Sequence, residues 1–191
     1  ISINFSRCHR VVTCPSQLCF NKIFKAMDII KLLQNELNQE AVTTRKFLAL
    51  VPFDKPDYAP HEKSMKMMAL ATHIADLSSW PKLGVETDEL DFATAPYNPT
   101  QVDNNEQLIA LFDKGIEESL ASLAEVEEAF LERPWVLRTG EQIHAEMTKY
   151  GLIRVSLNQI THHRAQLGVY LRLLNIPIPG SYGPSADDMN F

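Results

Sequence analysis

Residues 157–188, LNQITHHRAQLGVYLRLLNIPIPGSYGPSADD, join a periodic apolar segment with two adjacent histidines to a tail rich in proline and glycine. The periodic segment begins upstream of this stretch, and its positions recur every three or four residues, which is the spacing of one helix face. These positions are Tyr150, Ile153, Leu157, Ile160, Arg164, Leu167, Leu171 and Leu174. We therefore predict an amphipathic helix from about Glu141 to Asn175, ended by the proline at position 177.

Three earlier segments show the same kind of periodicity. Residues 28–51 form a stripe of about six helical turns. A second helix is predicted from about Glu62 to Trp80, where the following proline stops it. A third begins at Asp103, whose carboxylate is expected to cap the free backbone N–H groups, and runs to Pro134.

Four amphipathic helices without a convincing strand predict an all-α protein, a four-helix bundle. Residues 81–102 show no sustained period and connect the second helix to the third. That connection is long for antiparallel neighbours and could span the bundle, which would let these two helices run parallel. The 191 residues suffice for one domain with a substantial core, and no apolar run approaches the length of a membrane span.

The first 26 residues differ from the rest of the chain. They contain all three cysteines and four basic residues, but no acidic residue. We interpret residues 1–26 as an extension, loosely ordered or non-native, because the apolar core and cleavage site of a secretory signal are missing. Residues 27–191, the expected domain with its tail, carry 14 basic and 24 acidic residues, a net charge of −10. This charge argues against nucleic-acid binding, and the absence of cysteine fits a cytoplasmic protein.

The two adjacent histidines are expected to point in different directions. At 100° per residue, His163 lies about 60° from the centre of the apolar stripe and His162 about 160° from it. His163 is therefore predicted to face the bundle interior, and His162 to face solvent or a rim. Gln159 lies one turn before His163 on the same edge, so that both side chains can address one point.

A further histidine, His73, lies within the apolar face of the second predicted helix. Two inward imidazoles can meet across a bundle core, and neutral imidazole is a good ligand for divalent metals. The alternative is that both are hydrogen-bonded core residues without a ligand. Arg164, within the same stripe, either pairs with a buried carboxylate or extends its stem along the core to the surface.

Two motifs resemble those of a known family. THHRAQLGVYLRLLNIPIPGSYGPSADD (161–188) resembles the end, and SMKMMALATHIADLSSW (64–80) the second helix, of the DinB-like, YfiT-related metal-dependent four-helix proteins. The resemblance covers about residues 27–188 and implies an up-down-down-up bundle. It also implies a zinc or nickel ion held by three histidines. Transferred position by position, two of these ligands are His73 and His163, and the third position holds Gln159.

The glutamine departs from the family pattern, because an amide oxygen is a poorer zinc ligand than an imidazole nitrogen. Three outcomes are open: a weakened site completed by Gln159 and water, a site that recruits His162, or no metal. Roles in supporting a ligand or binding substrate are suggested for further residues. Arg164 and Gln166 could orient a ligand or bind an anionic group, and Asp76 could accept a ring N–H of His73. Tyr182 either closes the mouth of the site or is simply packed. His162 is included among these supporting residues.

The resemblance implies a metal-dependent transferase that uses a low-molecular-weight thiol, or a hydrolase, acting on a small molecule. The alternative is a non-catalytic small-molecule-binding or stress-related bundle with a degraded metal site. No serine, cysteine or paired carboxylates suggest another catalytic centre, and catalytic residues are not assigned. The expected partners are a small molecule and, as in many bundles of this kind, a second copy of the chain, but neither nucleic acid nor a membrane.

Overall fold

The computed structural model describes residues 27–189, so the interpretation of residues 1–26 as an extension lies outside the described part. The described residues form five α-helices, one 3-10 helix and a three-stranded sheet. In chain order they are α1 (Ile29–Leu48), α2 (Met67–Leu77), α3 (Trp80–Glu86), β1 (Glu89–Asp91), α4 (Asn105–Ala124), η3 (Glu128–Glu132), β2 (Pro134–Thr139), β3 (Gln142–Thr148) and α5 (Lys149–Leu173). None of the helices in this part of the chain is long and apolar enough to cross a membrane.

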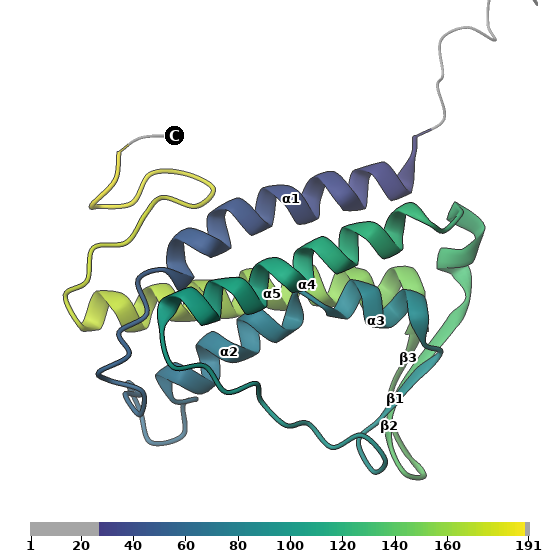
Figure 1. The fold of residues 1–191 in the computed structure, drawn as a ribbon, viewed down its shortest axis with the longest axis horizontal. Helices are drawn as coiled ribbons and strands as arrows, with labels where there is room; N and C mark the ends of the chain where they lie inside the picture. Colours follow the sequence, from purple (N-terminus) through teal and green to yellow (C-terminus); the bar gives the residue numbers. More distant parts are fainter. Residues whose placement is uncertain (1–26, 190–191) are drawn as a thin grey trace, which may run out of the picture.

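The helices lie side by side in two directions. Figure 1 shows α1 and α5 running one way, and α2, α3 and α4 the opposite way. Both α4 and α5 pack against α1, α2 and α3, so the apolar faces of all five helices meet in one core. The centre of the core holds side chains that are fully buried or nearly so, among them Leu37, Leu48, Leu70, Ile74, Leu108, Phe112, Leu157 and Leu167.

The first predicted helix corresponds closely to α1. Asp28 caps it, since its carboxylate accepts a hydrogen bond from the Lys31 backbone N–H at 2.9 Å. The predicted apolar stripe is buried from Leu33 to Leu48, and one acidic residue, Glu40, is buried with it.

The second predicted helix is wrong in its extent. The chain forms α2 and α3 instead of one helix, and Pro81 lies in the first turn of α3 rather than after a helix end. Ser78 lies at the break and is tied to α4: its hydroxyl donates to the Phe112 carbonyl at 3.0 Å, and its carbonyl accepts from the Ser119 hydroxyl at 2.7 Å. Gly115 permits this approach, because a Cβ there would lie 1.9 Å from the Ser78 hydroxyl oxygen.

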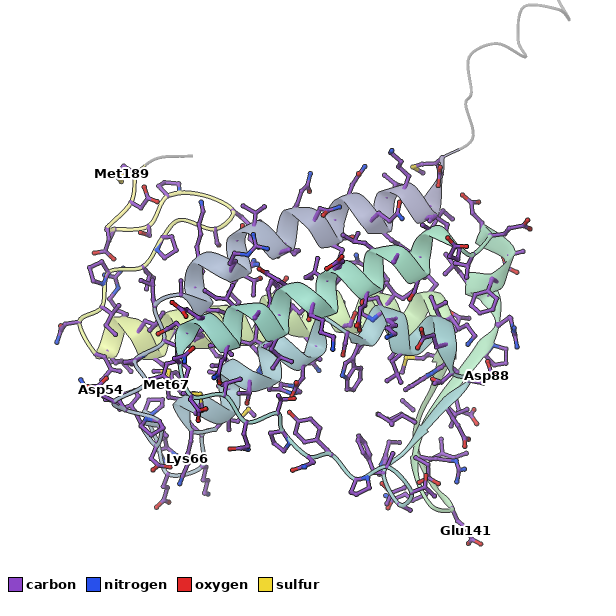
Figure 2. The ribbon with its side chains drawn as sticks, viewed as in Figure 1. Asp54, Lys66, Met67, Asp88, Glu141 and Met189 are labelled. Atoms are coloured by element: carbon purple, nitrogen blue, oxygen red, sulfur yellow. The ribbon has the colours of Figure 1, made fainter. Side chains whose placement is uncertain are left out.

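The expectation of a fold without strands is also wrong. The order of the sheet is β1-β2-β3, with β1 parallel to β2 and β2 antiparallel to β3. The hairpin turns at Gly140, which adopts a positive φ of 57° that glycine accommodates without strain. Figure 2 shows Asp88 where the chain leaves α3 for the sheet, and Glu141 at the far tip of the hairpin.

Two more predicted helix boundaries are wrong. Because β2 and β3 occupy residues 134–148, the last helix begins at Lys149 and not near Glu141. The third helix was predicted to run to Pro134, but α4 ends at Ala124 and is followed by η3. Trp135 of β2 is fully buried, and its indole N–H donates to the Thr87 hydroxyl at 3.1 Å.

The cap of α4 lies one residue beyond the predicted one. Asn104, not Asp103, caps the helix and accepts from the Gln107 backbone N–H at 2.9 Å. The Gln107 side chain in turn accepts from the Asp103 backbone N–H at 2.8 Å. The predicted pair of Asp103 and Glu106 is thus wrong: Asn104 caps the helix, and Gln107 reaches back to the residue before the cap.

Candidate metal centre

The packing of α2 against α5 brings two of the predicted ligands together. The ring centroids of His73 on α2 and His163 on α5 are 4.8 Å apart, and the ring planes are inclined by 78°. Both side chains are half-buried, whereas the neighbouring His162 is exposed, with its ring centroid 4.9 Å from that of His163. Adjacent positions on one helix thus give one inward and one outward histidine.

Gln166 determines which nitrogen of His163 carries the proton. The Gln166 side-chain oxygen lies 2.9 Å from Nδ1 of His163, and its amide nitrogen lies 3.1 Å from Nε2 of His162. A carbonyl oxygen can only accept, so Nδ1 of His163 must be the protonated nitrogen. In the neutral ring, Nε2 of His163 then keeps its lone pair free for a ligand.

Two further polar groups at this position are uncommitted. Within residues 27–189, neither His73 nor Gln159 makes a hydrogen bond, and both side chains are only partly buried. Gln159 precedes His163 by four residues and therefore lies beside it on the same face of α5. His73 and Gln159 are thus free to bind a ligand, and Gln159 lies one helical turn from His163 on α5.

The surroundings favour neutral imidazoles. Burial lowers the pKa of His73 below its ordinary value of 6.5, and the nearby His163 lowers it further. Burial also lowers the pKa of His163, and His162 adds to this, although the hydrogen bond with Gln166 acts in the opposite direction. At neutral pH both rings are therefore free of the second proton that would prevent metal binding.

The set of donors differs from that of a complete structural metal site. Within the described residues, no three histidine, cysteine, aspartate or glutamate side chains are grouped so that they could hold a metal ion. His162 is occupied by Gln166 and faces solvent. Of the three positions that the sequence suggested as ligands, the structure thus brings His73 and His163 together, and Gln159 is the remaining donor on the same face of α5.

The sequence suggested that Asp76 accepts a hydrogen bond from His73, but the described part of the chain shows no such bond. Its two carboxylate oxygens accept instead from the Tyr97 hydroxyl at 3.0 Å and the Thr100 hydroxyl at 3.2 Å. Burial raises the pKa of Asp76, while these hydrogen bonds oppose the rise. The pKa of Tyr97 is also raised, first by burial and then by the nearby negative charge of Asp76. The Tyr97 ring lies edge-to-face with His73, with centroids 6.1 Å apart.

Arg164 lies away from the two imidazoles, in the interface between α5 and α1. It is 2% exposed and donates to the Glu40 carboxylate at 2.6 Å and to the Thr44 hydroxyl at 2.9 Å. This is the buried pairing that the sequence left open, and it leaves Arg164 in a structural contact rather than beside the two imidazoles. Tyr182 joins the same cluster: its hydroxyl donates to Glu40 at 2.7 Å, and its ring lies 5.3 Å from the Arg164 guanidinium carbon.

Comparison with known proteins identifies the family. A model of the DinB family matches residues 24–190. The chain belongs to the DinB family. The resemblance of the two sequence motifs is thereby confirmed, and the helical fold with its small sheet is the form that the DinB family takes here. No curated protein matches the sequence.

Solved structures of DinB-like proteins share this fold. A DinB-like protein from Bacillus subtilis superposes with a TM-score of 0.61 at 20% identity, covering 78% of this chain and 97% of its own. A DinB family member from Exiguobacterium sibiricum gives 0.59 at 22% identity, covering 81% and 97%. A DinB-like protein from Bacillus cereus gives 0.60 at 16% identity, covering 80% and 97%. At these identities the likeness establishes the fold alone.

Three residues beside or behind the predicted centre were not identified from sequence. Glu40 falls within the apolar stripe of α1, one residue before Ala41, and an acidic residue there was a signal of a buried ion pair. Tyr97 and Thr100 belong to an aperiodic connection, and no spacing rule relates them to His73.

Proposed function

We propose that this DinB-family protein binds a divalent metal such as zinc or nickel through His73, His163 and Gln159, and acts as a thiol-dependent transferase on a small molecule. The observation that carries the proposal is the set of uncommitted donors. His73 and Gln159 make no hydrogen bond within residues 27–189, and Nε2 of His163 has no hydrogen-bond partner there. Polar groups so placed in a half-buried site favour a ligand that needs all three.

The charge of the donors favours an anionic co-ligand. Two imidazoles and an amide are all neutral, and within the described residues no carboxylate makes an ion pair or hydrogen bond with His73 or His163. When bound, a divalent cation would supply Lewis acidity and stabilise the thiolate form of a small thiol. This neutrality of the protein donors supports thiol transfer over a site closed by a protein carboxylate.

The remaining residues have supporting roles in this proposal. Gln166 holds His163 in the tautomer with a free Nε2 and simultaneously donates to His162. His162, on the exposed side of the helix, orients Gln166 rather than contributing a ligand. Hydrolysis on the same site would need the same donors, with water in place of the thiol.

A second function, small-molecule binding without chemistry, is favoured by one observation. No group of three histidine, cysteine or acidic side chains within residues 27–189 is suited to a metal ion, and an amide at position 159 lowers the affinity that a third imidazole would give. In that case the half-buried imidazole pair would serve as a polar contact for an organic ligand.

Metal content of the untagged protein, measured by elemental analysis after dialysis against zinc or nickel, tests the proposal. We expect close to one ion per chain, lost in the His73→Ala/His163→Ala variant and retained in the matched His61→Ala/His144→Ala variant, which removes two exposed histidines. Gln159→His should bind zinc more tightly, because it restores a third imidazole. Protein without metal under all of these conditions would favour the non-catalytic binder.

A further inference from the structure

The connection between β1 and α4 returns along α2 before it enters α4 (Figure 1). Two of its hydroxyls bind one side chain of α2, since the Tyr97 hydroxyl donates to one oxygen of Asp76 and the Thr100 hydroxyl to the other. Both oxygens of this half-buried carboxylate are therefore engaged in holding residues 97–100 against the helix.

The attachment places an aromatic ring at the candidate metal centre. Asp76 follows His73 by three residues, so the two side chains lie on the same face of α2. The Tyr97 ring, held by Asp76, lies edge-to-face with the His73 ring, and the two ring planes are inclined by 87°. The ring centroids of His163 and His73 are 4.8 Å apart. His73 is thus in contact with two rings, one from the core helix α5 and one from the connection.

We propose that Asp76 is a positioning residue that holds Tyr97 as one wall of the imidazole site, and that this wall selects ligands carrying an apolar or aromatic group beside the reacting atom. The ligand selection rests on the proposed function, whereas the positioning of Tyr97 does not.

The chemistry of the wall determines the class of ligand. The Tyr97 hydroxyl already donates to Asp76, so the side chain offers the site its ring rather than a hydrogen-bond donor. The Asp76 carboxylate behind it disfavours a ligand with its own negative charge at this position. Within residues 27–189, no lysine or arginine forms a hydrogen bond or ion pair with His73, His163 or Tyr97 that would attract such a charge.

The first experiment measures the accessibility of His73 in metal-free protein. Diethyl pyrocarbonate modifies neutral imidazoles, and the rate at each histidine is followed by peptide mass spectrometry at neutral pH. We expect several-fold faster modification of His73 in Asp76→Ala and in Tyr97→Ala. The exposed His61 and His144 serve as internal standards.

Thr94→Val is the matched control. It removes one hydroxyl from the same connection, but that hydroxyl donates to the Asp91 carbonyl at 3.2 Å, near the sheet and not at α2. The His73 rate should remain unchanged in this variant. An unchanged His73 rate in Asp76→Ala would overturn the positioning role, whether or not the protein binds metal.

The second experiment measures ligand class in cobalt-loaded protein by the thiolate-to-cobalt absorption band. Benzyl mercaptan presents a ring beside its thiol, and mercaptosuccinate presents two carboxylates. We expect a preference of about tenfold for benzyl mercaptan, which is the size of one favourable aromatic contact. Tyr97→Leu, which keeps Asp76, should reduce this preference.

The two experiments separate the proposals from each other. Faster modification of His73 in Asp76→Ala, without cobalt binding by the unsubstituted protein, would support the positioning of Tyr97 by Asp76. It would overturn both the metal site and the ligand selection. Cobalt binding with equal affinity for the two thiols would support the metal site and overturn the selection by Tyr97.

Discussion

The imidazoles of His73 and His163 lie 4.8 Å apart between centroids, although 90 positions separate them in the chain. They meet because α2 and α5 pack directly against each other and each histidine lies next to fully buried neighbours, Ile74 on α2 and Arg164 on α5. The separation of the two rings is therefore fixed by the helical core rather than by a loop. A ligand at this place would bind to a rigid pair of donors.

The imidazole pair makes stability depend on pH. Both folded-state pKa values lie below 6.5, so the unfolded chain binds more protons than the folded chain as the pH falls through this value. In the presence of a chelator, we expect the free energy of unfolding to be constant above pH 6.5. It should decrease as the pH falls from 6.5 towards the folded-state pKa values of the two histidines. Urea denaturation across this pH range measures the effect. The unfolding free energy of His73→Gln/His163→Gln should decrease less than that of the unsubstituted protein, whereas that of His61→Gln/His144→Gln should decrease by the same amount.

The buried pair of Arg164 and Glu40 should behave as a unit. Glu40→Leu leaves a buried guanidinium without its carboxylate and is expected to cost about 3–5 kcal/mol of unfolding free energy. Adding Arg164→Met should restore much of that loss, because the second charge is removed as well. Equilibrium denaturation of both single variants and the double variant measures this. Equal, additive losses in the cycle would show that the two side chains do not interact.

Gly115→Ala tests the close contact at the break between α2 and α3. Its new Cβ would lie 1.9 Å from the Ser78 hydroxyl oxygen and 3.0 Å from the Ser79 backbone nitrogen, so the Ser78 side chain must move and lose its hydrogen bond to α4, or the helices must shift apart. We expect destabilisation of about 1–3 kcal/mol, as for overpacked cores. Gly183→Ala is the control, since a Cβ there meets no atom within 4 Å. A melting temperature unaffected by Gly115→Ala would contradict the packing described here.

Gln166→Met removes the group that fixes the tautomer of His163. Gln166 is exposed, so we expect little change in stability, but a zinc affinity lower by about 10–100-fold, as is usual for the loss of a hydrogen bond to a ligand histidine. Competition with a chromophoric chelator gives the affinity. Gln142→Met, at an exposed position on β3, should leave it unchanged.

Periodicity predicted the long elements and the direction of the histidines, because both depend on a single helix at a time. The stripe of α1 and the burial of Ile153, Leu157, Ile160 and Leu167 follow directly from the rise and turn of the helix. The break at Ser78 could not be predicted in this way, because its cause is a pair of hydrogen bonds to α4, more than 30 residues later in the sequence.

The sheet was missed for a related reason. Trp135 and Val136 have high strand propensity and Gly140 is a good turn residue, but β1 contributes only three residues, too few to show an alternating pattern. The contact of Tyr97 with His73 was beyond any sequence rule, since an aperiodic segment has no defined face. The histidine pair itself could be predicted from the sequence, because each member lies on a helix with a clear apolar stripe.

Lys149, the first residue of α5, has a consequence for the order of folding. Its buried ammonium group donates to the carbonyls of Gly84 and Thr87 and pairs with Asp88 at 2.8 Å, all of them more than 60 residues earlier in the chain. An ammonium group cannot be removed from water at low cost until these acceptors are in place. The first turn of α5 should therefore become protected from hydrogen exchange only together with the end of α3, so that a long loop closes in one cooperative step of refolding.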